Sequence, residues 1–131
     1  MSVLVDSSIW IEYFRHGTFS KEIEFFIDGN LLVTNHLILS ELIPFLKVRN
    51  QKKLVHLLNS IRKNTINIVW NEIIDFQCKC LKQGINGVGI PDLMIAQNAK
   101  QNNSALYSLD NHFFLIQAIV GFEMYNSKPL H

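Results

Sequence analysis

Long apolar runs are absent from this sequence, and so are the patterns of a secreted or membrane protein. No segment approaches the roughly 18–20 uninterrupted apolar residues of a membrane-spanning helix. The opening residues, MSVLVD, carry neither the basic segment nor the apolar core of a signal peptide. We therefore expect a protein that neither crosses a membrane nor is exported.

Charged residues are also scarce, at 18% of the chain against roughly 25% in an average soluble domain. The 12 Lys and Arg nearly balance the 11 Asp and Glu, which leaves a net charge of +1. This balance says nothing about nucleic acid, because only the distribution of charge along the chain can. The low charge predicts that a partner covers part of the apolar surface.

Cysteine is limited to Cys78 and Cys80, two positions apart in a predicted helix. Residues at this spacing point to different sides of a helix, so an internal disulfide is not expected. A lone C-x-C also lacks the further ligands of a zinc site. The pair is typical of structural thiols in a reducing, cytoplasmic setting.

The chain does contain enough apolar material for one core. Its 131 residues match one domain, which we expect to span residues 1–131, and 48% of them are hydrophobic. Short apolar runs predict strands at 1–5, 31–34, 66–70, 105–108 and 122–125. Between them, spacing and caps predict helices that begin at Ser8, near Ser20 and after Asn71, and others at 37–48, 50–64, from Pro91, and 111–118. This alternation is typical of an α/β fold, with a parallel sheet covered on both faces.

Four acids stand out because each lies beside apolar residues near the end of a strand or the start of a helix. They are Asp6, Glu41, Asp92 and Asp110. Parallel sheets bind ligands at the carboxyl ends of their strands, where these side chains could meet. Two carboxylates about 4 Å apart repel by roughly 1–4 kcal/mol, so such a cluster calls for a cation. Oxygen ligands favour Mg²⁺ or Mn²⁺. Taken singly, each acid is also an ordinary turn or first-turn residue.

The segments around these acids resemble, in order, the four motifs of PIN-domain nucleases. They are LVDSS at 4–8, LSEL at 39–42, GIPDLMIAQ at 89–97 and YSLDNHF at 107–113. The resemblance covers essentially the whole chain, whose compact length is similar to that of VapC-type toxins from bacterial toxin–antitoxin pairs. It implies a three-layer α/β/α sandwich around a mostly parallel sheet of about five strands. It also implies Mg²⁺- or Mn²⁺-dependent endoribonuclease activity.

The same resemblance assigns roles to individual residues. Asp6, Glu41, Asp92 and Asp110 become the catalytic acidic quartet. Of these, Asp6 and Asp92 are expected to be direct metal ligands, and Asp110 a ligand directly or through water. Glu41 is expected to hold a water molecule or a second ion.

Serines next to the quartet are expected to support it. Ser7 or Ser8 would bond the Asp6 carboxylate or the substrate phosphate, and Ser108 would orient the fourth acid. Many family members carry a further acid just after that fourth acid, whereas this chain has Asn111 and His112. The departure leaves open a second metal site, and it leaves open whether His112 contacts phosphate or is only solvated.

A basic stretch offers one place for RNA. Between Glu41 and Glu72 there is no acid, yet the stretch holds half of the chain's Lys and Arg. A polyanion held near acids needs such a flank. The predicted RNA-binding residues are Lys47, Arg49, Lys52, Lys53 and, after the first helix, Arg15. An ordinary solvated face remains the alternative.

Aromatic residues on the first predicted helix carry a similar ambiguity. Trp10, Tyr13 and Phe14 lie at three- and four-residue spacing and could stack on bases. A role in the core or in a dimer is the alternative.

The resemblance further implies a homodimer and an antitoxin whose C-terminal segment occludes the active site. Two other interpretations of the function remain open. A phosphatase of the haloacid-dehalogenase type needs a second Asp two residues after the first, where this chain has Ser8. A non-catalytic PIN-like binding module is the other, and metal binding distinguishes it from a nuclease.

Overall fold

The computed structural model describes residues 1–125, which form five strands and seven helices. The strands are β1 (Ser2–Val5), β2 (Leu32–Thr34), β3 (Arg62–Lys63), β4 (Ser104–Tyr107) and β5 (Glu123–Met124). The helices are α1 (Ser7–His16), α2 (Ser20–Asp28), α3 (His36–Val48), α4 (Lys52–Ser60), α5 (Trp70–Lys82), α6 (Ile90–Gln101) and α7 (Asn111–Val120). All strand pairs are parallel, in the order β3-β2-β1-β4-β5.

Strand β1 lies at the centre of the sheet and carries the core. Val3, Leu4 and Val5 are fully buried, because both faces of the sheet are covered. β1 pairs in register with β4 along its whole length, so that Val5 lies opposite Tyr107. The residues that follow these two strands therefore emerge side by side at one edge of the sheet.

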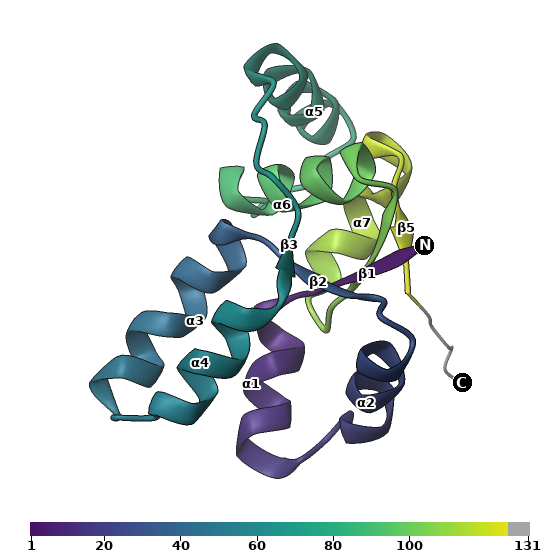
Figure 1. Cartoon of the computed structure of the whole chain (residues 1–131). Coiled ribbons are helices and arrows are strands. Elements are labelled where there is room, and N and C mark those ends of the chain that lie inside the picture. Colours follow the sequence, from purple (N-terminus) through teal and green to yellow (C-terminus); the bar gives the residue numbers. More distant parts are fainter. Residues whose placement is uncertain (126–131) are drawn as a thin grey trace.

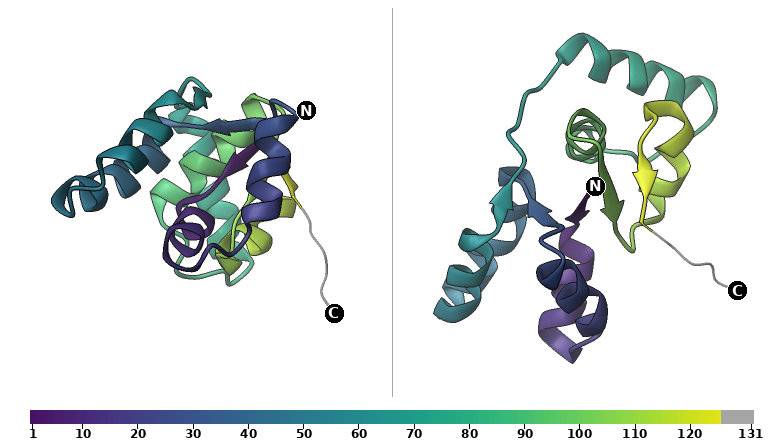
Figure 2. Two further views of the ribbon diagram at one scale, coloured as in Figure 1. Left: turned by 60° about the horizontal axis from the view of Figure 1, so that its bottom comes forward. Right: turned by 45° about the vertical axis from the view of Figure 1, so that its right-hand side comes forward.

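The helices form a layer on each side of the sheet (Figures 1 and 2). Helices α5, α6 and α7 pack against one another on one side, and α1 and α2 lie on the other, where α1 contacts α3. After β3 the chain returns to the other side of β1, where β4 and β5 extend the sheet, and the later helices lie on the opposite face. The predicted three-layer α/β/α sandwich is confirmed. Helices α3 and α4 pair as a hairpin that projects from the body, and we call it the α3–α4 arm.

The strand predicted at 66–70 is wrong. β3 is shorter and lies earlier, at Arg62–Lys63, and the β-branched segment after it runs alongside α6 instead of joining the sheet. Side-chain amides of α6 take the place of a partner strand there: Gln97 bonds both the N–H and the carbonyl of Val69, at 3.2 Å each. Asn98 donates to the Thr65 carbonyl at 2.9 Å. Buried polar side chains satisfy the hydrogen-bonding groups of this backbone segment. A prediction made from apolar runs does not take such side chains into account.

Several helix boundaries also differ from the prediction. The helix expected over 50–64 ends at Ser60, because the extended Ile61 leads the chain into β3. The first helix is capped by Asp6 instead of Ser8, and α5 by Val69 instead of Asn71. The remaining expected strands and helices are present within a few residues of their predicted ends.

Both cysteines are free thiols, Cys78 exposed and Cys80 buried. None of the helices within residues 1–125 has the length and apolarity needed to span a membrane.

Candidate active site

Asp6 lies at the centre of the candidate site, directly after β1. The residue is 5% exposed, and its Oδ2 atom accepts hydrogen bonds from the hydroxyls of Ser8, at 3.0 Å, and Ser108, at 2.7 Å. Because the backbone N–H of Asp6 also bonds the Tyr107 carbonyl, the residue is held against the end of β4. Two hydroxyl donors offset part of the cost of burying this charge.

Ser108 fastens the loop after β4 to the loop after β1. Besides donating to Asp6, its hydroxyl oxygen accepts the backbone N–H of Asp110 at 3.0 Å. The hydroxyl of Ser8 lies 3.3 Å from it and accepts the N–H of Leu109 at 3.0 Å. The two serines thus hold Asp6 and Asp110 in a fixed relation.

Asp92 and Asp110 occupy the first turns of two neighbouring helices. Asp92 is the third residue of α6, and its Oδ2 accepts the N–H of Gly89, the cap of that helix, at 3.3 Å. Asp110 caps α7 and accepts the N–H of His112 at 2.9 Å. The imidazole Nδ1 of His112 lies 3.2 Å from Asp110 Oδ1 and 3.8 Å from Asp92 Oδ2. It therefore sits between the two carboxylates.

Glu41 completes the cluster from α3. As a whole residue it is exposed, but protein surrounds its carboxylate enough that burial raises the pKa above the ordinary glutamate value. A hydrogen bond from the Ser7 side chain lowers the pKa, and the charges of Asp6, Asp92 and Asp110 raise it further. Contacts between α1 and α3 bring Ser7 to this position.

The four carboxylates bring negative charge together, and the protein places few positive side chains beside them. Burial raises the pKa of Asp92 above its usual range, and the charges of Asp110 and Asp6 add to this effect. Opposing them are the Gly89 N–H and the charge of His112. Within residues 1–125, no Lys or Arg forms an ion pair with the four carboxylates, and His112 is the one basic side chain within 4.0 Å of them.

The structure thus brings all four predicted acids to one edge of the sheet. Of the two serines predicted as partners of Asp6, Ser8 bonds its carboxylate, whereas Ser7 bonds Glu41. Ser108 reaches the fourth acid through its backbone N–H and bonds the Asp6 side chain as well.

The predicted RNA-binding residues are all exposed but lie away from the cluster. Lys47, Arg49, Lys52 and Lys53 gather at the tip of the α3–α4 arm, and Arg15 lies at the end of α1. The guanidinium of Arg49 stacks over the Phe45 ring at 4.3 Å.

The aromatic residues of α1 belong to the interior. Trp10 is fully buried and stacks on Phe14 at a centroid distance of 5.6 Å, while Tyr13 meets Trp10 edge-on at 5.9 Å. Tyr13 and Phe14 pack on the core. This arrangement favours the core role over base stacking.

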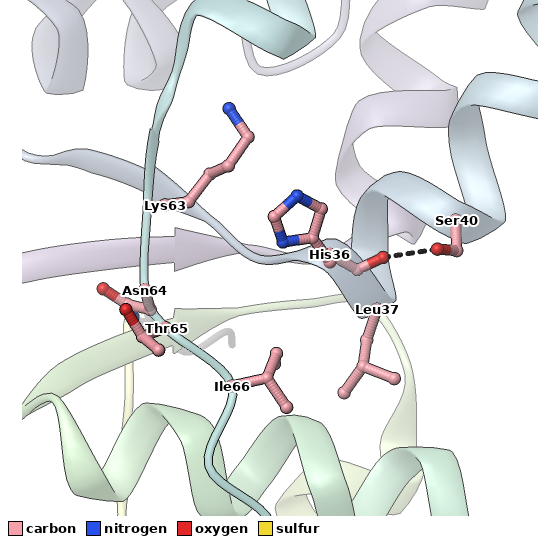
Figure 3. Close-up of a pocket in the computed structure, with 7 residues that line it drawn as sticks. All are labelled: His36, Leu37, Ser40, Lys63, Asn64, Thr65 and Ile66. Carbon is pink, nitrogen blue, oxygen red and sulfur yellow. Dashed lines mark hydrogen bonds between the residues drawn. The ribbon is translucent and has the colours of Figure 1, made fainter.

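A pocket of about 490 Å³ lies between the start of α3 and the segment that begins at the end of β3 (Figure 3). Its lining residues are His36, Leu37, Ser40, Lys63, Asn64, Thr65 and Ile66. Leu37 precedes Glu41 by four residues, so that both lie on one face of α3. This pocket could not be predicted from the sequence, because its two walls are far apart in the chain.

Comparison with known proteins agrees with this architecture. The PIN domain model matches residues 3–118. The crystal structure of VapBC2 from Rickettsia felis, bound to a DNA fragment from their promoter, contains a chain of the same fold: the TM-score is 0.72 at 18% identity, with 98% of this chain and 100% of that chain covered. FitAcB from Neisseria gonorrhoeae gives a TM-score of 0.67 at 15% identity, with 95% and 96% covered. A comparison with the sequences of curated proteins gives no match. With the family model covering most of its length and all four acids at one edge of the sheet, this chain belongs to the PIN domain family.

Proposed function

We propose that this protein is an endoribonuclease that uses Mg²⁺ or Mn²⁺ to hydrolyse RNA phosphodiester bonds. The observation that carries the proposal is the convergence of Asp6, Glu41, Asp92 and Asp110, whose charges act on one another. Membership of the PIN domain family supports it. The choice of RNA over DNA comes from the resemblance to VapC-type toxins.

A divalent cation fits the residues present. The donor set is rich in carboxylate oxygens, the ligands that Mg²⁺ and Mn²⁺ prefer. Burial is the largest cause of the raised pKa of Glu41 and of Asp92, the like charges of the neighbouring acids add to it, and a cation would relieve both effects. Asp6, Asp92 and Asp110 would hold the ion. When bound, it would acidify a water molecule and neutralise charge on the phosphoryl oxygens.

The protein's own groups would complete the reaction. Glu41, kept more basic by burial and by its neighbours, would accept the proton of the attacking water. Ser8 and Ser108 would hold the Asp6 carboxylate in place throughout. Because attack by water needs no ribose hydroxyl, the products would carry a 5′-phosphate and a 3′-hydroxyl.

The exposed basic tip of the α3–α4 arm would hold the RNA backbone. Lys47, Arg49, Lys52 and Lys53 form a cationic group with no acid between Glu41 and Glu72 to neutralise it. The pocket beside α3 would receive a nucleotide near the scissile bond, because His36 and Lys63 line it together with apolar side chains (Figure 3).

We also propose that the chain associates with an antitoxin protein and with a second copy of itself, as a VapC-type toxin of a type II pair would. The structural neighbours named above support the first association. For the second, α5 exposes a stripe of apolar residues, Trp70, Ile74 and Leu81, at helical spacing. Light scattering on the Ile74→Glu variant tests the dimer: the variant is expected to be monomeric.

Cleavage of cellular RNA by the purified chain tests the proposed activity. Asp92→Asn should abolish cleavage in Mg²⁺ or Mn²⁺ while leaving the far-UV spectrum unchanged. The matched control is Asp75→Asn, which changes an exposed aspartate paired with Lys79 on α5 and should retain activity. Full activity in Asp92→Asn would refute the assignment. A chain that neither cuts RNA nor binds Mn²⁺ would be a non-catalytic PIN-like module.

A further inference from the structure

His112 lies among the four acids, but the proposed function gives it no role. It lies in the first turn of α7, and its backbone N–H donates to the side chain of Asp110, the helix cap, at 2.9 Å. This bond fixes the start of the helix, so that the imidazole projects between two carboxylates. Its Nδ1 atom lies 3.2 Å from Asp110 Oδ1 and 3.8 Å from Asp92 Oδ2.

The opposite edge of the ring is covered by the glycine-rich loop between α5 and α6. Gly87 has a φ of +83° there, and a Cβ at this position would lie 3.4 Å from His112 Nε2. A side chain at this position would be strained by the backbone conformation and would lie in van der Waals contact with the ring. The loop therefore packs against one nitrogen of the imidazole while the other faces the acids.

The spacing of these three side chains suits a shared ion. Each of Asp92, Asp110 and His112 offers one ligand atom, and the three atoms lie within 4.8 Å of one another. An octahedral ion with bonds of about 2.1 Å places neighbouring ligand atoms about 3 Å apart. The 3.2 Å between His112 and Asp110 is close to that separation, and the 3.8 Å to Asp92 needs only a small side-chain movement.

We propose that His112 is a nitrogen ligand of the divalent ion and that it makes this site prefer Mn²⁺ to Mg²⁺. The inference rests on the proposed function, because it assumes that the acids bind a metal ion. Mg²⁺ is bound almost entirely through oxygen, whereas an imidazole favours transition-metal ions. Mn²⁺ accepts both kinds of ligand, so a site of carboxylates and one imidazole favours it.

An alternative role for the same side chain is electrostatic. A protonated His112 would form ion pairs with Asp92 and Asp110 and would compete with the metal ion instead of binding it. The two roles differ in what happens to metal affinity when the imidazole is removed. Loss of a ligand weakens Mn²⁺ binding, whereas loss of a competing cation strengthens it.

Pulsed electron paramagnetic resonance of Mn²⁺ added to the purified chain tests the proposal. The wild type should show coupling between Mn²⁺ and a nitrogen nucleus, and His112→Gln should lose it. His56→Gln, which changes an exposed histidine on α4, is the matched control and should retain the coupling. Calorimetric titration should show that His112→Gln weakens Mn²⁺ binding by about tenfold or more. Mg²⁺ binding should change by less than about threefold, because the glutamine offers an oxygen.

The outcomes separate the failure of this proposal from that of the proposed function. Mn²⁺ bound to the wild type without nitrogen coupling would overturn the role of His112 while leaving the metal site intact. Nitrogen coupling that persists in His112→Gln would also overturn the role of His112 alone. Tighter binding of Mn²⁺ by this variant would have the same meaning. A wild type that binds no Mn²⁺ would overturn both proposals. If His112→Gln fails to fold, as judged by far-UV circular dichroism, the wild-type and His56→Gln spectra still decide whether a nitrogen ligand is present.

Discussion

Removing the Ser108 hydroxyl should destabilise the protein more than its small size suggests. This one oxygen donates to the buried Asp6 carboxylate at 2.7 Å and accepts the N–H of Asp110 at 3.0 Å. The side chain is itself buried, at 6% exposure. Ser108→Ala would leave Asp6 with one hydroxyl donor instead of two and would release the loop that carries the fourth acid.

The magnitude follows from these contacts. A hydrogen bond to a charged group contributes about 1.5–3 kcal/mol, and a neutral one about 1 kcal/mol, to the free energy of unfolding. Relaxation and water entry recover part of this sum, so we expect a loss of about 2 kcal/mol. For a domain of this size that corresponds to a fall in Tm of about 6–10 °C.

Urea unfolding of the metal-free protein, followed by circular dichroism, measures this effect. The matched control is Ser60→Ala, since the Ser60 hydroxyl is exposed and bonds only the local carbonyl of Leu57. We expect the control to lose less than about 0.5 kcal/mol. If Ser108→Ala loses no more than this control, the hydroxyl does not fasten the two loops together and the account of the site's framework is wrong.

Three further predictions test other parts of the structure. The folded state raises the pKa of Glu41 and of Asp92, so the folded metal-free protein binds protons more tightly than the unfolded chain does. Its free energy of unfolding should therefore rise as the pH falls from neutral toward the ordinary pKa of a carboxylic acid. Saturating Mn²⁺ should remove or reverse that trend. An identical dependence of stability on pH with and without metal would argue against the raised pKa values. Replacing Lys52 and Lys53 by Glu should weaken RNA binding and flatten its dependence on salt, whereas the same replacement of two lysines on α5 should not. An unchanged dependence of RNA affinity on salt would place the RNA elsewhere. Gln97→Met, which removes three hydrogen bonds of a buried amide, should cost about 2–3 kcal/mol in urea unfolding and speed amide exchange in the segment after β3.

The framework of the fold could be predicted because its signals are local. Val3, Leu4 and Val5 form an unbroken apolar run that ends at Asp6, and such runs are typical of the buried strands of a parallel sheet. With strand and helix alternating, the carboxyl ends of the strands fall at one edge, so the meeting of the acids could be expected before any coordinates. The position of β3, the edge strand that pairs with β2, could not be predicted.

The error at 66–70 shows why. Ile66 and Ile68 have the β-branched character of a strand, but the chain extends there against α6, where Gln97 and Asn98 supply the hydrogen bonds. Those amides lie about 30 residues away, and polar residues in a helix normally predict a solvated face. Only the tertiary structure reveals that these amides are buried at 1% and 2% exposure.

The candidate site shows the same division between local and distant signals. The four acids could be identified from their neighbours, whereas the contact between Ser7 and Glu41 depends on how α1 packs against α3. The place of His112 depends on Gly87, 25 residues earlier, whose loop packs against the ring. Spacing along the chain gives no indication of either contact.

The most direct test of the central claim is the chemistry of the RNA ends left by the purified chain in Mn²⁺. Hydrolysis by water held at the acidic quartet predicts fragments with a 5′-phosphate and a 3′-hydroxyl, formed in Mn²⁺ and absent in EDTA and in Asp92→Asn. Fragments that end in a 2′,3′-cyclic phosphate, or cutting that persists in EDTA, would show that the ribose hydroxyl attacks without a metal ion. That result would contradict the function proposed for these four carboxylates.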